Sequence, residues 1–260
     1  MIRRSVCALL LGLGLTAAQA GELPSLITTL KPSLIIVGSY DETDSPRFQF
    51  RGTGFVVEGD HLAVTNVHVL PPAVEEGGDE SRRQVSVLVR DAGGNWTRRD
   101  ASVVSTDSAH DLALLHFEGA PAPAVMLDDR PMAVEGSDII LMGFPLGGAL
   151  GFSVVTHRGI VSSIAPIALP APGSGGLNAR AVRQLREGSF DILQLDAVAY
   201  PGNSGGPVID VASGRVVGIV NMVLVKGSRE SAIGSPTGIS YAIPVRYVRQ
   251  LMSEGQPGGR

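Results

Sequence analysis

Three side chains in this sequence are of the types that nucleophilic catalysis requires. Ser204 lies in the turn-forming segment Gly-Asn-Ser-Gly-Gly-Pro of residues 202–207, His68 ends one apolar run, and Asp111 begins another. A serine hydroxyl is a poor nucleophile on its own. It needs a histidine to accept its proton and a carboxylate to hold the imidazole in the right tautomer. Together the three residues predict attack by a serine on a carbonyl carbon.

The order of these residues along the chain separates the folds that use them. Here the order is His, Asp, Ser, as in chymotrypsin-type enzymes, whereas α/β-hydrolases run Ser, Asp or Glu, His and subtilisins run Asp, His, Ser. Residues 202–206 also match the G-x-S-x-G elbow of α/β-hydrolases, but that elbow leads from a strand into a helix. The residues after Pro207 read as a strand. Both observations favour the chymotrypsin type.

At all three segments the sequence resembles the HtrA/Deg-type trypsin-like serine proteases. The motifs of that family are T-N-x-H-V around the histidine, D-L-A-h-L from the aspartate (h is apolar) and G-N-S-G-G-P around the serine, and residues 65–69, 111–115 and 202–207 carry them intact. The likeness extends from about Leu26 to Pro244. It implies a serine endopeptidase acting on misfolded or exported polypeptides, with His68 as general base, Asp111 as its partner and Ser204 as nucleophile.

Asp107 is a rival carboxylate close to Asp111. We prefer Asp111 because the apolar run begins directly after it, which places its side chain at the rim of a barrel. The other histidines, His61, His110, His116 and His157, show no metal-ligand spacing. No metal or other cofactor is expected.

The resemblance also assigns the groups that stabilise developing negative charge. The backbone N–H groups of Gly202 and Ser204, on either side of Asn203, are expected to form the oxyanion hole. Gly202 is expected to have a positive φ, which side chains resist. Digestive trypsin-like enzymes have an aspartate in place of Asn203, so no zymogen salt bridge is expected. Control should depend instead on loop order, above all in the insert of residues 166–188.

The residues expected to line the specificity pocket are apolar or neutral. Val198 stands where enzymes that cleave after basic residues have an aspartate, so a buried arginine or lysine would find no counter-charge. Cleavage after small or medium aliphatic residues is therefore expected. The candidate substrate-binding residues are Val198, Ala199, Tyr200, Asn221, Met222 and Val223.

Strand signals dominate the chain. Its 33 glycines and 17 prolines separate many short β-branched runs, as in all-β proteins. Six runs precede and six follow the crossover at residues 121–131, which predicts two six-stranded antiparallel β-barrels of the chymotrypsin type, about 33–120 and 132–243, with the triad in the cleft between them. Short helices are expected over 24–30 and 244–253. The expected strands are 34–39, 49–57, 61–65, 85–90, 97–105, 112–117, 138–142, 151–163, 191–197, 207–210, 216–223 and 238–242.

Residues 1–20 read as a secretory signal peptide. Arg3 and Arg4 precede an apolar stretch over 6–15, and residues 18–20 form a small-residue cleavage site. The stretch is too short to span a membrane, and no later one is longer. We therefore expect a periplasmic or extracellular protein.

The segment after the signal peptide is expected to form one protease domain, residues 21–253. Removing the signal peptide removes Cys7, the only cysteine, so the core rather than disulfides must hold the domain. It also moves the formal net charge from -4 to -6, because it contains two arginines and no acidic residue. That acidity argues against nucleic acid or an anionic membrane as partner. Residues 254–260 read as a flexible tail, with no room for the PDZ domain of many HtrA proteases.

The sequence bears on three further possibilities, namely a trimer, a glutamyl endopeptidase and a non-catalytic homologue. Many HtrA proteases trimerise, but the segment before the first strand is short, with no aromatic residue before Tyr40, and gives this no support. A glutamyl endopeptidase would share the fold but uses a histidine in the pocket wall, and residues 219–222 contain none. A non-catalytic chaperone or binding homologue would have no need of the intact triad.

Overall fold

The computed structural model of the protein describes residues 22–59, 61–71, 84–91, 93–147, 151–166, 190–221 and 238–255. The chain enters through helix α1 (Glu22–Leu30) and a single turn, η2 (Lys31–Ser33), and its last described element is helix α4 (Val245–Gly255). The strands of the first half are β1 (Leu34–Tyr40), β2 (Phe48–Val56), β3 (Leu62–Asn66), β4 (Gln84–Arg90), β5 (Trp96–Asp107) and β6 (Leu112–Phe117). Those of the second half are β7 (Asp138–Gly143), β8 (Val155–Pro166), β9 (Asp191–Asp196), β10 (Pro207–Asp210), β11 (Val216–Val220) and β12 (Ile239–Pro244).

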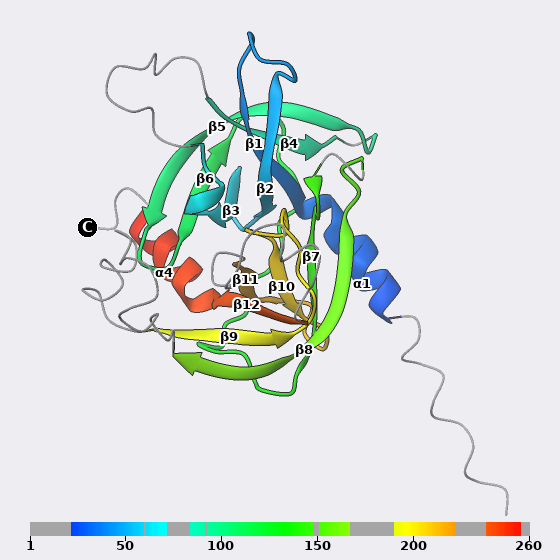
Figure 1. The fold of residues 1–260 in the computed structure, drawn as a ribbon, viewed down its shortest axis with the longest axis vertical. Coiled ribbons are helices and arrows are strands. Elements are labelled where there is room, and N and C mark those ends of the chain that lie inside the picture. Colours follow the sequence, from blue (N-terminus) through cyan, green and yellow to red (C-terminus); the bar gives the residue numbers. More distant parts are fainter. Residues whose placement is uncertain are drawn as a thin grey trace, which may run out of the picture.

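The strands close into two barrels. The first has the order β1-β2-β3-β6-β5-β4 and the second the order β10-β11-β12-β9-β8-β7, and the strand pairs within both are antiparallel. In Figure 1 the first barrel lies above the second. The predicted pair of six-stranded antiparallel barrels with a short C-terminal helix is confirmed.

The predicted strands all appear, with some changes at their ends. β6 and β10 have the predicted bounds. β8 begins at Val155 rather than at residue 151, because Gly151 and Phe152 have positive φ values of 70° and 56°, which do not fit a strand. Helix α4 runs to Gly255, two residues into the predicted tail. The signal peptide lies outside the described residues.

The segment between the barrels runs along both of them. Val125 pairs with Val57 of the first barrel, and Leu127 pairs with Val216 of the second. This is the crossover that the prolines over residues 121–131 predicted.

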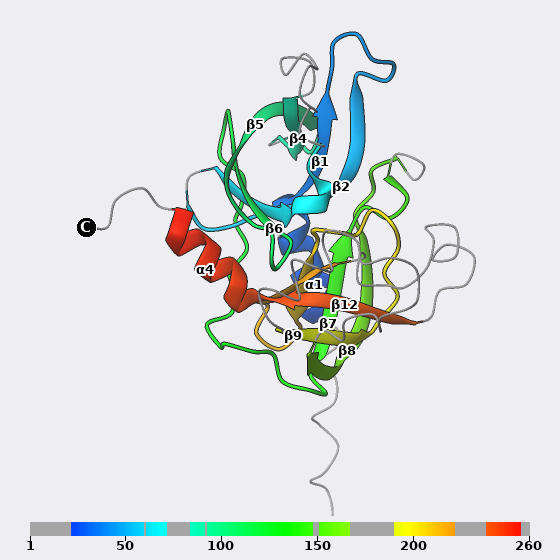
Figure 2. The same ribbon diagram turned by 60° about the vertical axis from the view of Figure 1, so that its left-hand side comes forward.

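Helix α4 also joins the two halves. It follows β12 of the second barrel but packs on β5 and β6 of the first, as Figure 2 shows. Its buried residues Val245, Val248 and Leu251 belong to the large apolar cluster between the barrels. This is the face that the helical spacing predicted.

Strand β6 contributes side chains to two apolar clusters, one between the barrels and one inside the first barrel. Successive side chains of a strand point to opposite faces. Leu112 and Leu114 join the cluster between the barrels, whereas Leu115 and Phe117 join the interior of the first barrel. Full burial of such a side chain stabilises the fold by about 1.5–3 kcal/mol. The barrels are thus packed inside and also against each other.

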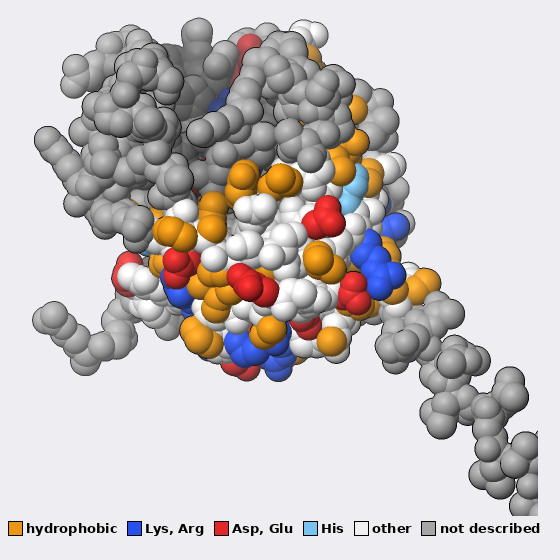
Figure 3. Space-filling model, turned by 60° about the horizontal axis from the view of Figure 1, so that its bottom comes forward, with side chains coloured by type: hydrophobic (Ala, Val, Ile, Leu, Met, Phe, Trp, Pro, Cys, Tyr) orange, Lys and Arg blue, Asp and Glu red, His pale blue; other side chains and the backbone are white. Residues whose placement is uncertain are grey.

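The outer surface shows a mixture of side-chain types. On the face of Figure 3, hydrophobic side chains are interspersed with acidic and basic ones. None of the helices in the described part of the chain is long and apolar enough to cross a membrane.

We predict that Gly159→Ala destabilises the second barrel. A Cβ at Gly159 of β8 would lie 1.9 Å from the backbone oxygen of Asp196 and 2.8 Å from the Cβ of Ala197, so β8 and β9 would have to separate. Overpacking of this kind costs about 1–3 kcal/mol, and each kcal/mol lowers Tm by roughly 2–4 °C. Thermal unfolding checks this, with Gly255→Ala as control because its nearest atoms lie at 3.4 Å. Equal Tm values for the two variants would contradict the packing argument.

Candidate active site

Strand pairing brings His68 and Asp111 together. β3 and β6 are neighbours in register Asn66↔Leu112, so the turn η3 (Val67–Val69) that follows β3 lies beside the residue that precedes β6. The Nδ1 atom of His68 lies 2.6 Å from Oδ2 of Asp111, and the backbone N–H of His68 donates to Oδ1 at 3.1 Å. This carboxylate therefore fixes both the ring and the backbone of His68.

Asp111 is held in an unusual conformation. Its φ is 58°, a left-handed value that costs an ordinary L-residue about 1–2 kcal/mol, although aspartate tolerates it better than most. Its backbone oxygen accepts hydrogen bonds from Nδ2 of Asn66 at 2.9 Å and from the N–H of Val67 at 3.2 Å. The residue is only 4% exposed. Local contacts of the first barrel thus offset the strain.

The second barrel also contacts this carboxylate. Nδ2 of Asn221, directly after β11, donates to Oδ2 of Asp111 at 2.8 Å, and Asn221 is buried. The sequence predicts Asn221 at the edge of the specificity pocket. In the structure its amide joins the second barrel to the Asp111 carboxylate, a contact that sequence patterns do not reveal because the two residues are far apart along the chain.

Asp107, the rival carboxylate, has a different partner. Its Oδ2 lies 2.5 Å from Nδ1 of His110, and its Oδ1 accepts from the N–H groups of Ala109 and His110 at 3.0 and 3.1 Å. Burial alone would raise the pKa of Asp107, but the hydrogen bonds from His110 and Ala109 outweigh it and lower the pKa below the ordinary value. The geometry therefore supports Asp111 as the partner of His68.

The segment around Ser204 is a tight turn fastened to β2. Gly202 and Gly205 have φ values of 105° and 84°, so both occupy the region that favours glycine. Oγ1 of Thr53 donates to the backbone oxygen of Gly202 at 2.7 Å, and the N–H of Thr53 donates to the backbone oxygen of Ser204 at 2.9 Å. Ser204 is only 6% exposed. One threonine of the first barrel thus fixes the serine turn of the second.

Gly52 allows the serine turn and the histidine turn to approach each other. A Cβ at this position would lie 2.7 Å from the side chain of Val69, next to His68, and 3.0 Å from the backbone oxygen of Ser204. Both turns therefore pack on the same short stretch of β2. Neither Gly52 nor Thr53 could be assigned from the sequence, because nothing in the short Gly-Thr-Gly run of residues 52–54 shows that two distant turns contact it.

The expected oxyanion-hole segment contains a buried and unsatisfied side chain. The N–H of Asn203 donates to the oxygen of Tyr200 at 2.9 Å. Its side chain is fully buried, and neither Nδ2 nor Oδ1 has a hydrogen-bond partner among the described residues. An unsatisfied buried amide costs about 1–3 kcal/mol.

Three of the expected pocket residues, Val198, Ala199 and Tyr200, lie on the segment between β9 and β10. Ala199 is buried, whereas Val198 and Tyr200 are partly buried. Oγ of Ser240 on β12 accepts from the N–H of Ala199 at 2.9 Å. Met222, Val223 and the insert over residues 167–188 lie outside the described residues.

A histidine that sequence analysis left unassigned lies beside this segment. The ring of His157 on β8 packs against Tyr200 with centroids 5.7 Å apart, and its buried Nε2 has no hydrogen-bond partner among the described residues. Burial lowers the pKa of His157, which favours the neutral ring. In the described part of the chain, no group of three or more His, Cys, Asp and Glu side chains could hold a metal ion.

The paired barrels, the His68–Asp111 contact and the serine turn fastened between them define the chymotrypsin-type class. The family profile described as a trypsin-like peptidase domain matches residues 52–219. The chain belongs to this family, and its resemblance to the HtrA/Deg type is confirmed by the relatives that follow.

Two curated relatives illustrate the likeness. A probable periplasmic serine endoprotease, DegP-like, from Chlamydia trachomatis is 32% identical over 225 residues, which cover 84% of this chain and 37% of that protein. The magnetosome formation protease MamE of Paramagnetospirillum magneticum is 31% identical over 201 residues, which cover 76% of this chain and 22% of that protein. The chain thus spans little more than a third of the length of the first relative and less than a quarter of that of the second.

Solved structures share the fold. The crystal structure of Deg5 has a TM-score of 0.63 and 21% identity, and the match covers 90% of this chain and 94% of that one. The protease Rv3671c from M. tuberculosis H37Rv, in an inactive form, has a TM-score of 0.60 and 21% identity, with 94% and 97% covered. At this identity the likeness establishes the architecture.

We predict that Asn221→Ala lowers peptidase turnover roughly 10–100-fold, because a hydrogen bond to a charged group contributes about 1.5–3 kcal/mol. Asn221→Asp should be more harmful, since a second carboxylate would lie against Asp111. Steady-state kinetics of the two variants check this order. Asn95→Ala, at an exposed turn, is the control. Wild-type turnover in Asn221→Ala would show that the cross-barrel bond is dispensable.

Proposed function

We propose that the protein is an exported serine endopeptidase that hydrolyses misfolded or exported polypeptides through His68, Asp111 and Ser204. The observation that carries the proposal is the 2.6 Å contact between Nδ1 of His68 and the buried Asp111 carboxylate. The serine turn beside it supports the role of Ser204. The leader-like residues 1–20 and the name of the periplasmic relative support export.

The proposed reaction has two halves. Oγ of Ser204 attacks the scissile carbonyl carbon while Nε2 of His68 takes the hydroxyl proton, and Nδ1–H stays bonded to Asp111. The N–H groups of Gly202 and Ser204 stabilise the tetrahedral oxyanion. The C–N bond then breaks as His68 gives its proton to the leaving amine. In the second half, water attacks the acyl carbon while His68 takes its proton. The ester bond to Ser204 then breaks, Ser204 regains a proton from His68, and the acid product leaves.

Ser204→Ala and His68→Ala should each reduce hydrolysis to a small residual rate. Their losses should not add in the double variant, because nucleophile and base act as a unit. Asp111→Asn should cost on the order of 10⁴ in turnover by leaving the wrong tautomer. Single-turnover assays on an unfolded protein substrate provide the measurement. A crippled Asp107→Asn beside a nearly normal Asp111→Asn would overturn the carboxylate assignment.

The apolar residue types at the expected pocket positions 198, 199 and 223 support cleavage after small or medium aliphatic residues. We predict a preference for Val, Ala or Leu before the scissile bond, with modest discrimination because one methylene is worth only about 1–3 kcal/mol. Val198→Asp should shift cleavage toward Lys or Arg. A peptide-library profile measures both, with Val104→Asp, an exposed position on β5, as control. A wild-type profile dominated by Glu or Arg would sink the aliphatic assignment.

Two other functions have distinct signatures. A glutamyl endopeptidase is favoured by one observation, the ring of His157 against Tyr200, and it would cleave after Glu. If the protein is a chaperone, the wild type and Ser204→Ala should protect unfolded proteins from aggregation equally well. Peptide profiling and aggregation assays on the same preparations separate these from the leading proposal.

A further inference from the structure

The turn that carries Asp111 has its own support, separate from the triad. It joins β5 to β6, and Asp111 is its last residue. Asp107 closes the other end, because its carboxylate accepts the N–H groups of Ala109 and His110 and bonds the ring of His110. His110 is therefore fixed at both backbone and ring, and it directly precedes Asp111.

The ring of His110 reaches into the C-terminal half of the molecule. It stacks on Tyr247 of α4, with centroids 3.7 Å apart and an interplanar angle of 19°. Phe190, directly before β9, packs edge-on against it at 4.4 Å, and Phe190 and Tyr247 also contact each other at 5.5 Å. The His110 side chain is only 17% exposed. A side chain from a turn of the first barrel thus packs against two aromatic rings of the second half, Phe190 and Tyr247.

The helix that supplies Tyr247 is itself anchored. Arg246 lies 3.8 Å from Asp191 of β9, and within the helix it donates to the Tyr247 hydroxyl at 2.7 Å. One helical turn further on, Arg249 contacts Asp129 of the crossover segment at 3.2 Å.

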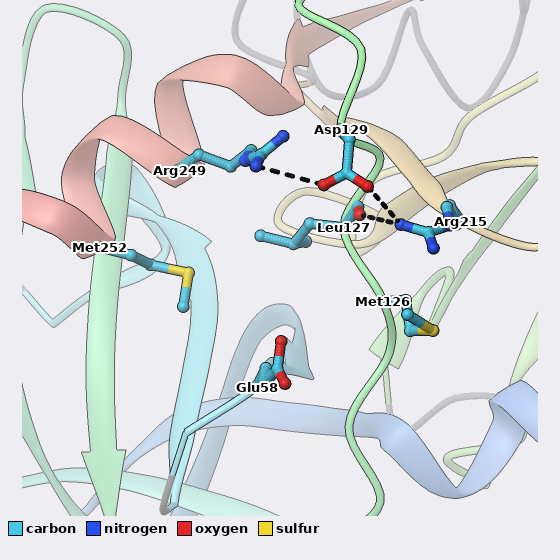
Figure 4. A pocket seen from close by; sticks show the side chains of 7 residues that line it. All are labelled: Glu58, Met126, Leu127, Asp129, Arg215, Arg249 and Met252. Atoms are coloured by element: carbon cyan, nitrogen blue, oxygen red, sulfur yellow. Dashed lines mark hydrogen bonds and ion pairs between the residues drawn. The ribbon is translucent and has the colours of Figure 1, made fainter.

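The same Asp129 carboxylate also binds Arg215, at 3.0 Å, so it joins α4 to the turn between β10 and β11 (Figure 4). These residues line a cavity of about 340 Å³ between α4, the crossover and that turn. Arg215 and Arg249 in this cavity are both paired with Asp129, and these pairs tie the helix to the crossover segment beside the second barrel.

We propose that His110 is a positioning residue for Asp111. Its contacts with Tyr247 of α4 and with Phe190 fix the position of the turn that ends in Asp111. They thereby determine where the Asp111 carboxylate contacts His68. The inference rests on the proposed function, since it assigns a consequence for catalysis to the geometry of Asp111. The charged and titratable groups around the ring are Asp107 on its own turn, Tyr247 and Arg246 on α4, and Asp191 on β9.

The test is His110→Ala. A carboxylate displaced by a fraction of an ångström should lower kcat about 10-fold, within the range that small misplacements cause, while KM stays unchanged. The acidic limb of the pH profile of kcat/KM should move to lower pH, because a displaced carboxylate stabilises the protonated imidazole less. Tyr247→Leu, which removes the ring that stacks on His110, should give the same changes. Tyr247→Phe keeps a ring at this position and should behave like the wild type.

A double-variant cycle and two controls complete the test. The effects of His110→Ala and Tyr247→Leu should be less than additive, because both act through one contact. His116→Ala, at an exposed position on β6, the strand that follows Asp111, should match the wild type. If His110→Ala does not fold, the kcat and pH profile of Tyr247→Leu are compared with those of Tyr247→Phe instead.

The outcomes separate this inference from the proposed function. Wild-type kcat and an unshifted pH profile in folded His110→Ala or Tyr247→Leu would overturn the positioning role and leave the protease intact. An inactive wild type would instead refute the proposed function. A readout independent of turnover is the low-field proton NMR signal of the Nδ1–H between His68 and Asp111. It should shift in His110→Ala and Tyr247→Leu but not in His116→Ala, and an unchanged signal would count against the inference.

Discussion

The buried carboxylate of Asp111 is the interaction on which the rest of the site depends. It receives the ring and backbone of His68 from the first barrel and the amide of Asn221 from the second. A buried charge is tolerated only when its oxygens are paired, because desolvation otherwise costs several kcal/mol. Both barrels must therefore be in place before this carboxylate is satisfied. The orientation of His68 is in this sense a property of the interface between the barrels.

The same interface explains why glycine and threonine occupy positions that a strand would normally fill with larger residues. A Cβ at Gly205 would lie 2.1 Å from the backbone oxygen of Thr53, and one at Gly52 would overlap Val69. Close approach of backbones leaves no room for side chains, so hydrogen bonds rather than apolar packing fasten the serine turn. Apolar residues such as Phe144 and Met142 surround this polar seam and join the large cluster between the barrels.

Local patterns predicted most of the fold, and long-range contacts account for what they missed. Short apolar runs directly after a turn marked β6 and β10 with the right bounds, whereas the left-handed Phe152 shortened β8 in a way that composition does not reveal. His68, Asp111 and Ser204 stand in short motifs and could be named from sequence. The bond from Thr53 to Gly202 joins residues 149 positions apart, and that from Asn221 to Asp111 spans 110. Such contacts exist only once the barrels pack.

Helix α4 has a consequence for how the molecule is assembled during synthesis. Chains ordinarily fold from the N-terminal side as they emerge, yet the first barrel here is covered on β5 and β6 by the last described helix. Until that helix arrives, the apolar residues beneath it remain open to solvent and the partner of His110 is missing. The Asp111 turn thus gains its full support only after both barrels and the helix that follows them have been synthesised.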